Sequence, residues 1–372
     1  MFKNTHLWLP GYLARSRQRG FTGPAHVFFC FVDHFEPLWR GASVEQGLER
    51  VRAWRANYPK MAEQFHDADG RSPQHSFFYP SEEYRPELLD ELAKLCQAGY
   101  GEVEVHLHHD NDTPDNLTRT IEEFKVKLRN HGLLANDASG KVRYGFIHGN
   151  WALDNSRRDG RWCGVNNELR VLRDTGCYAD FTLPSAPSDT QTRKINSIYY
   201  ATDDPLCPKS HDTGEDACVG KRPSGDLLIV QGPLALNWRE RKWGLLPRIE
   251  NADVAGYAPA TSARIAKWVE QRIGVKGKPD WIFVKVHTHG CQERNFDTAW
   301  GQSAARMHQM LHVNFNQGRP FVLHYVTARE VCNLIHAAEQ EIAGTPQILR
   351  DHGLFPPPIR LGGQPKASQQ QP

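Results

Sequence analysis

The chain has 372 residues, of which 39% are hydrophobic and 24% charged, and its formal net charge is +2. This length accommodates one large α/β domain or two medium ones, and the balanced charge gives no reason to expect a nucleic-acid partner. No apolar run has signal-peptide length or the roughly 20 residues that span a bilayer, so we expect no membrane span and a cytoplasmic location. The eight cysteines include no CxxC pair, which fits a reducing compartment.

Strand-like apolar runs alternate with helix-like segments along most of the chain. In chain order, the expected strands are 26–37, 75–80, 102–108, 142–148, 178–184, 226–231, 281–288 and 320–327. The expected helices are 44–65, 86–99, 116–132, 166–176, 262–274, 302–316 and 328–344. This alternation predicts an α/β fold with a largely parallel sheet, either open or closed into a barrel.

Four segments organise the chain. We expect an N-terminal extension over 1–24, a single α/β domain over 25–345 and a flexible tail over 346–372, which is rich in Pro, Gln and Ser. Residues 185–245 interrupt the strand–helix rhythm, and we interpret them as a long insertion that covers the site as a lid.

Five of the apolar runs end in polar residues that can bind metals or donate protons, and chemistry in barrel folds collects at such strand ends. The third run shows the clearest pattern, because side chains on a strand alternate between faces. Val103, Val105 and Leu107 should pack under helices. The opposite, inward face then carries Glu102, Glu104, His106 and His108.

A metal site is one explanation of this inward face. His106 and Asp110 are four residues apart across the end of the strand, so both can reach one ion, and His with carboxylate suits Zn²⁺ or another first-row divalent metal. The other explanation is that His106 and His108 are interior histidines that bond to Glu102, Glu104 or the backbone. Three His and two Asp within seven residues favour the metal site.

Two further strand ends carry the same residue types. Asp33 and His34 end the first run, with Glu36 just beyond; a metal ligand or a base is one role for Asp33, and a helix cap or turn is the other. In 281–290, alternation puts Lys285, His287 and His289 on one face. A buried Lys285 needs a partner, for which Glu102 or Glu104 is the natural candidate.

A sugar site is indicated after the fourth run. His148, Asn150, Trp151 and Asp154 combine a flat apolar face with hydrogen-bonding groups, and Gly149 lets the backbone approach a ligand. We add Tyr79, at the end of the second run, to these candidate substrate contacts.

Taken in order, these motifs resemble those of the polysaccharide deacetylase superfamily, in particular the nodulation-type chitooligosaccharide deacetylases. The family's Thr-Phe-Asp-Asp-Gly motif corresponds to residues 30–34, so that Asp33 takes the place of the metal-binding Asp and Val32 that of the catalytic base. Either Asp33 is the base and His34 a ligand, or the base lies elsewhere, with Glu36 as a candidate. The family's His-x-x-x-His motif begins at His106.

The remaining motifs depart further from the family. Asp110 stands at the second His of His-x-x-x-His, with His108 or His109 as substitutes, and residues 148–151 replace Arg-Pro-Tyr. His287 or His289 resembles the late histidine that protonates the leaving group. The resemblance implies a distorted (β/α) barrel of about seven parallel strands and a metal-dependent amide or ester hydrolase.

We therefore expect a zinc-dependent hydrolase that removes an N- or O-acetyl group from a carbohydrate. The candidate metal ligands are Asp33, His34, His106, His108 and Asp110, and the candidate catalytic residues are Asp33, Glu36, His287 and His289. A glycoside hydrolase with two of Asp33, Glu36 and Asp154 as its carboxylates is the first alternative. A carbohydrate-binding relative without catalysis is the second. The sequence leaves the sugar and the oligomeric state open.

Overall fold

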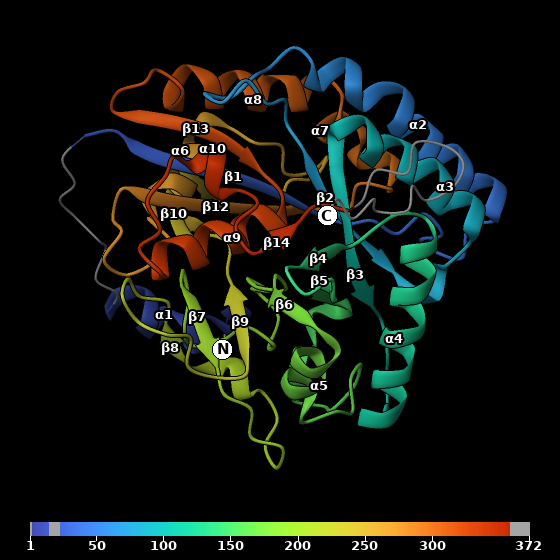
Figure 1. Cartoon of the computed structure of the whole chain (residues 1–372). Coiled ribbons are helices and arrows are strands. Elements are labelled where there is room, and N and C mark those ends of the chain that lie inside the picture. The colour runs from blue at the N-terminus through green and yellow to red at the C-terminus, as the bar shows by residue number, and fades with distance from the viewer. Residues whose placement is uncertain (1, 15–22, 358–372) are drawn as a thin grey trace, which may run out of the picture.

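A large, mostly parallel sheet forms the centre of the computed structural model, which describes residues 2–14 and 23–357 (Figure 1). The sheet has twelve strands, and the main path runs β12-β1-β2-β3-β5-β6-β9-β7-β8. Strand β13 pairs with the first half of β1, and β2 pairs with its second half. The parallel strands are β1 (Ala25–His34), β2 (His75–Pro80), β3 (Gly101–Leu107), β5 (Val142–His148), β6 (Cys177–Asp180), β9 (Leu227–Val230), β12 (Trp281–Thr288) and β13 (Phe321–Val326).

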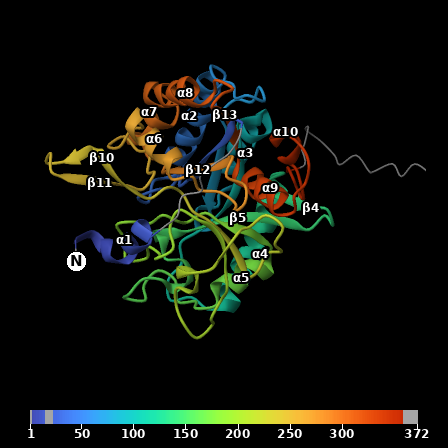
Figure 2. The same ribbon diagram turned by 90° about the vertical axis from the view of Figure 1, so that its left-hand side faces the viewer.

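Short antiparallel strands extend this sheet. They are β4 (Ala135–Asp137), β7 (Ile198–Ala201), β8 (Glu215–Asp216) and β14 (Leu354–Phe355). A separate hairpin of β10 (Ala235–Lys242) and β11 (Leu246–Glu250) projects from the body of the molecule (Figure 2). Among the described residues, no ladder joins β9 to β12. The α/β class and the largely parallel sheet are therefore confirmed.

Helices cover both faces of the sheet. They are α1 (Thr5–Ala14), α2 (Val44–Ala62), α3 (Pro86–Leu95), α4 (Pro114–Asn130), α5 (Glu168–Thr175), α6 (Ser262–Glu270), α7 (Phe296–Ala299), α8 (Gln302–Phe315), α9 (Ala328–Glu339) and α10 (Pro346–Leu349). Ser43, Thr113 and Thr327 begin α2, α4 and α9, because each side-chain oxygen accepts a bond from a backbone N–H of the first turn. Within the described ranges, no helix is both long and apolar enough to cross a membrane.

Strand alternation decides which residues meet which helices. Val103, Val105 and Leu107 pack in one core cluster with apolar residues of α2, α3 and α4, as predicted. Val284 and Val286 of β12 pack likewise against α6 and α8. The opposite faces of β3 and β12 bury Glu104, His106, Lys285 and His287. The sheet thus presents its polar side chains to one interior face.

Lys285 is buried, but its predicted partners are wrong. Its ammonium donates hydrogen bonds to the carbonyl oxygens of Phe181 and Leu183, just after β6. Burial lowers the pKa of Lys285, and the nearby Asp180 opposes this shift. Glu102 instead pairs with Arg329 of α9, and Glu104 accepts bonds from the Gly145 N–H and the Tyr178 hydroxyl.

Two expected segments also need correction. The 185–245 stretch does not form only a lid, because β7, β8 and β9 lie within it and join the main sheet. The start of the expected tail is folded, since α10 and β14 lie beyond residue 346 and Arg350 is fully buried against Asp67, Asp69 and Glu330. Residues 358–372 of that tail and 15–22 of the N-terminal extension lie outside the described residues.

Candidate metal centre

Four histidines and one glutamate come together at the carboxyl edge of the sheet. His34 is the last residue of β1, His106 and His108 lie at the end of β3, and His289 directly follows β12. Glu36, two residues beyond β1, lies between them. Its carboxylate forms one group with His106 and His108 and another with His34 and His289, and in each group the candidate ligand atoms lie within 4.8 Å of one another.

The first of these groups has the chemistry of a metal site. The Nε2 atoms of His106 and His108 lie 3.4 and 3.5 Å from Oε1 of Glu36. Nδ1 of His106 lies 2.7 Å from the Ile147 carbonyl oxygen, and Nδ1 of His108 lies 2.5 Å from Oε1 of Glu82. Carbonyl and carboxylate oxygens only accept, so both rings carry their proton on Nδ1. Outer-shell bonds of this kind orient histidine ligands in metal proteins.

The Nε2 atom of His106 is therefore a lone pair that faces a carboxylate. It is fully buried and has no hydrogen-bond partner. Two acceptors in contact repel each other unless a cation lies between them, and an unpaired buried polar atom is costly. The residues present thus fit a divalent ion bound by Glu36, His106 and His108, which is the two-imidazole, one-carboxylate set of many zinc enzymes.

His34 and His289 line the other side of Glu36. Their rings stack with centroids 4.6 Å apart. Burial, followed by the charges of His289, His106, His287 and His108, holds the pKa of His34 well below its ordinary value, so His34 is neutral at pH 7. Burial alone would raise the pKa of Glu36, but its approach to His106 and to the other histidines brings it below the ordinary value. His34 and Glu36 thus place a neutral imidazole beside an ionised carboxylate.

A cavity of about 390 Å³ opens over this centre. It is lined by His34, Glu36, Leu38, Trp39, Arg40, Gly41, Glu83, His108, Asn150, Trp151, His289 and Gln292. A second cavity of about 370 Å³ shares Trp151 and His289 with the first and also contains His287. A third, of about 520 Å³, shares Asn251, Asp253 and Tyr257 with the second. The three cavities adjoin one another in a row that begins at the histidines.

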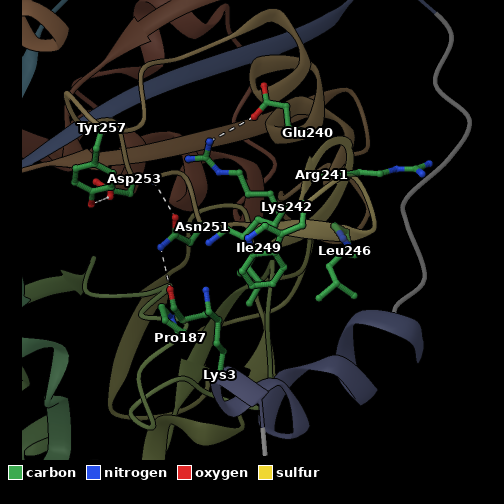
Figure 3. A pocket seen from close by; sticks show the side chains of 14 residues that line it. Lys3, Pro187, Glu240, Arg241, Lys242, Leu246, Ile249, Asn251, Asp253 and Tyr257 are labelled. Atoms are coloured by element: carbon green, nitrogen blue, oxygen red, sulfur yellow. Dashed lines mark hydrogen bonds and ion pairs between the residues drawn. The ribbon is translucent and has the colours of Figure 1, made fainter.

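The third cavity lies under the β10–β11 hairpin. Lys3, Arg241 and Lys242 line it together with Tyr257 and Asp253, and in Figure 3 Tyr257 lies beside Asp253 while Arg241 extends away from the other two basic side chains. The tyrosine hydroxyl donates to Asp253. This end of the row is more basic than the end at the histidines.

The loop after β5 supplies the wall between the first two cavities. Asn150 and Trp151 have φ angles of 53° and 57°, in the left-handed region that bulky residues rarely adopt. Gly149 precedes them, and the His108 ring occupies the space into which a Cβ would project. The backbone at Gly149 is closely approached, as predicted, but by the His108 ring and not by a ligand. The strained backbone holds Trp151 between the two cavities.

Asp33 is neither a metal ligand nor positioned as a base, contrary to prediction. It lies on the opposite face of β1 from His34, where it accepts a 2.6 Å bond from the Gly290 N–H and lies beside Trp54. Burial raises its pKa to about 8. Asp110, also predicted as a ligand, lies outside the groups of ligand atoms, and its carboxylate accepts the Trp162 N–H at 2.6 Å.

Three predicted substrate contacts lie elsewhere. Tyr79 is buried in the outer core and donates to the Glu83 carbonyl, because alternation points it toward the helices. Asp154 is buried and accepts a 2.6 Å bond from the Ser210 N–H. His148 ends β5 but belongs to a separate group of ligands. Asn150 and Trp151 line the cavities as expected.

Two residues of the site were missed from the sequence. Glu82 and Glu83 form a short 3-10 turn at the end of β2, and one orients His108 while the other lines the cavity. Burial, with Glu36 and Glu82 nearby, raises the pKa of Glu83 to about 7 against the effect of a bond from the Leu38 N–H. The rule that functional residues follow strand ends predicts both, since they follow HSFFYP after a single residue, Ser81.

Comparison with known proteins adds little. No protein-family model matches the sequence, and no curated protein matches it. Among solved structures, the chain is similar to the crystal structure of a 4-alpha-glucanotransferase from Thermococcus litoralis, with a TM-score of 0.41 and 12% sequence identity. The similarity covers 82% of this chain but only 39% of the glucanotransferase, so the chain spans well under half of that protein's length.

Proposed function

We propose that this protein is a metal-dependent hydrolase that removes an acyl group from a carbohydrate, with Glu36, His106 and His108 as the ligands of a divalent ion, zinc being the best match. The observation that carries the proposal is the buried, unpartnered Nε2 of His106, 3.4 Å from the Glu36 carboxylate. The proposed ligands do not include Asp33 and Asp110, and His34 lies beside them without being one of them.

A bound ion would polarise the acyl carbonyl and lower the pKa of a coordinated water. The residues of the chain do the rest. Glu83 is the carboxyl group in the cavity whose pKa lies near neutrality, and we assign it the role of proton acceptor. It replaces Asp33, which is sealed behind Gly290 and Trp54. Glu36 is committed to the ion.

His289 is assigned as the proton donor. His289 lines both the first and the second cavity, so its ring can reach a leaving group where the two cavities adjoin. His287 lines only the second cavity, and burial lowers its pKa to about 4 against the opposing effect of Asp253. A neutral His287 suits a positioning role. The two histidines thus divide the roles of acid and positioning group.

The row of cavities supports an extended carbohydrate as the substrate. Trp39, Trp151 and Tyr257 line it in succession, and aromatic faces with nearby amides such as Asn150 and Asn251 suit sugar rings and hydroxyls. The glycoside hydrolase alternative needs a facing pair of carboxylates, and neither Asp33 nor Asp154 lines any of the three cavities. Glu36 and Glu83 share the first cavity, but we assign Glu36 to the ion. Closure of the sheet into a distorted barrel and kinship with the polysaccharide deacetylases belong to this proposal.

The test uses an acetylated amino-sugar oligomer as the substrate. His289→Ala should lower the rate of acetate release about 10²–10⁴-fold while the metal content stays unchanged. His287→Ala should act mainly on KM. His66→Ala is the matched control, because that histidine is exposed and lines none of the three cavities. Full activity of His289→Ala would refute the assignment, and carbohydrate binding without turnover in the unaltered protein would favour the non-catalytic relative.

A further inference from the structure

A second group of ligand residues lies apart from the candidate metal centre. It contains His109, which follows β3; His148, the last residue of β5; Cys163; and Glu168, the first residue of α5. Their ligand atoms lie within 4.8 Å of one another. His148, Cys163 and Glu168 are fully buried, and the side chain of His109 is 7% exposed. None of the four lines the cavity over Glu36.

The spacing of these atoms matches a tetrahedral ion. Oε1 of Glu168 lies 3.2 Å from Nε2 of His109 and 3.5 Å from Nε2 of His148, and Oε2 lies 3.5 Å from the Cys163 sulfur. Ligands at the usual zinc bond lengths lie about 3.3–3.7 Å apart at the corners of a tetrahedron. The Glu168 carboxylate therefore lies at distances from the other three ligand atoms that are close to those between the ligands of one zinc ion.

Each ligand is also held by an outer contact. Nδ1 of His109 lies 3.0 Å from the Asp112 carboxylate, and Nδ1 of His148 lies 2.6 Å from the Gly149 carbonyl oxygen. The Val165 N–H donates to the Cys163 sulfur, and the Asp154 N–H donates to Oε2 of Glu168. Both histidines thus present Nε2 inward, as carboxylate- or carbonyl-oriented zinc ligands do.

His148 supplies the independent observation. It is completely buried, and its Nε2 has no hydrogen-bond partner although it faces the Glu168 carboxylate. Because Nδ1 bonds to a carbonyl oxygen, Nδ1 holds the proton and Nε2 carries a lone pair. If His109 and Glu168 only formed a hydrogen bond, the Nε2 lone pair of His148 would still face the Glu168 carboxylate with no donor or cation between them. A cation bound between them removes the conflict.

We propose that His109, His148, Cys163 and Glu168 bind a structural Zn²⁺. Thiolate and imidazole together select zinc over harder cations, and four protein ligands fill the tetrahedron, so no position remains for a substrate. The ion would join the loop after β3, the end of β5, the 156–167 loop and α5. It would thereby fix His108 and the strained Asn150–Trp151 loop, which adjoin two of its ligands in sequence.

Replacement of zinc by Co²⁺ tests this site separately from the catalytic proposal. A thiolate ligand gives cobalt an intense charge-transfer band in the near ultraviolet, and the group around Glu36 contains no cysteine. We expect this band in the cobalt-loaded unaltered protein and in cobalt-loaded His106→Ala. Cys163→Ser should lack the band, and its zinc-loaded form should contain about one zinc per chain fewer than the unaltered protein. Cys332→Ser is the control, because Cys332 is equally buried but lies outside both groups.

X-ray absorption at the zinc edge gives a reading that needs no variant. The zinc-loaded, unaltered chain should show a sulfur scatterer at about 2.3 Å. A spectrum without sulfur would overturn the proposal even if Cys163→Ser fails to fold, and so would a cobalt band that persists in that variant. Loss of deacetylation with the band intact would refute only the proposed function.

Discussion

Glu82 should control how tightly the candidate centre binds its ion. Its Oε1 accepts both the Nδ1 proton and the backbone N–H of His108, at 2.5 and 3.2 Å. Loss of such an outer-shell partner costs about 10–100-fold in metal affinity. Glu82→Gln keeps one carbonyl acceptor and removes the charge. Because the Glu82 side chain is 38% exposed and water screens it, we expect a loss near tenfold, or about 1.4 kcal/mol.

The assay is zinc competition with a chromophoric chelator at pH 7. Glu82→Ala, which removes both contacts, should approach the hundredfold end of the range, and Glu87→Gln on the exposed surface of α3 is the control with the same chemical change. An ion bound by His109 and Cys163 would serve as an internal reference, because Glu82 does not belong to that group of ligands. Unchanged affinity for both ions in Glu82→Ala would show that His108 is not a ligand.

Two further predictions concern stability. Glu250→Gln removes the carboxylate that neutralises the fully buried Arg264, which should cost about 3–5 kcal/mol and lower the melting temperature by roughly 4–7 °C. Glu270→Gln on the surface of α6 should cost under about 1 kcal/mol, and equal shifts of the two variants in a calorimetric scan would contradict this expectation. Burial lowers the pKa of His308 to about 3, so stability is lost as pH falls below about 6.5, where only the unfolded chain gains the proton. Between pH 7 and 5, urea denaturation should show the unaltered protein losing about 2 kcal/mol more than His308→Gln, and parallel losses would refute the shift.

The sequence predicted the parts of the site that depend on strand period alone. Alternation placed His106, Lys285 and His287 on the interior face, and all are buried there. The same rule explains the error at Asp33. His34 and Asp33 are neighbours on β1 and therefore point to opposite faces, so only one of them can reach the centre. A prediction that both residues bind one metal is therefore inconsistent with strand alternation.

Other features of the site could be found only in the folded chain, not in the sequence. The sequence predicts a carboxylate partner for Lys285, but Lys285 bonds to backbone carbonyls after β6 and Glu102 pairs with Arg329. The sequence does not show which loop covers a strand. The second ligand group joins residues from 109 to 168, and Cys163 lies in a loop with no periodic pattern. A ligand set drawn from four separate segments has no fixed spacing in the sequence, so only their meeting in space reveals it.

The central claim is that an ion lies between Glu36, His106 and His108. Crystals of the purified protein, measured on both sides of the zinc absorption edge, test it most directly. We expect an anomalous difference peak about 2.0–2.2 Å from Nε2 of both histidines and from a Glu36 oxygen, which disappears in His106→Ala. A fully folded, zinc-saturated protein without a peak at this position would show that these three residues do not bind the ion.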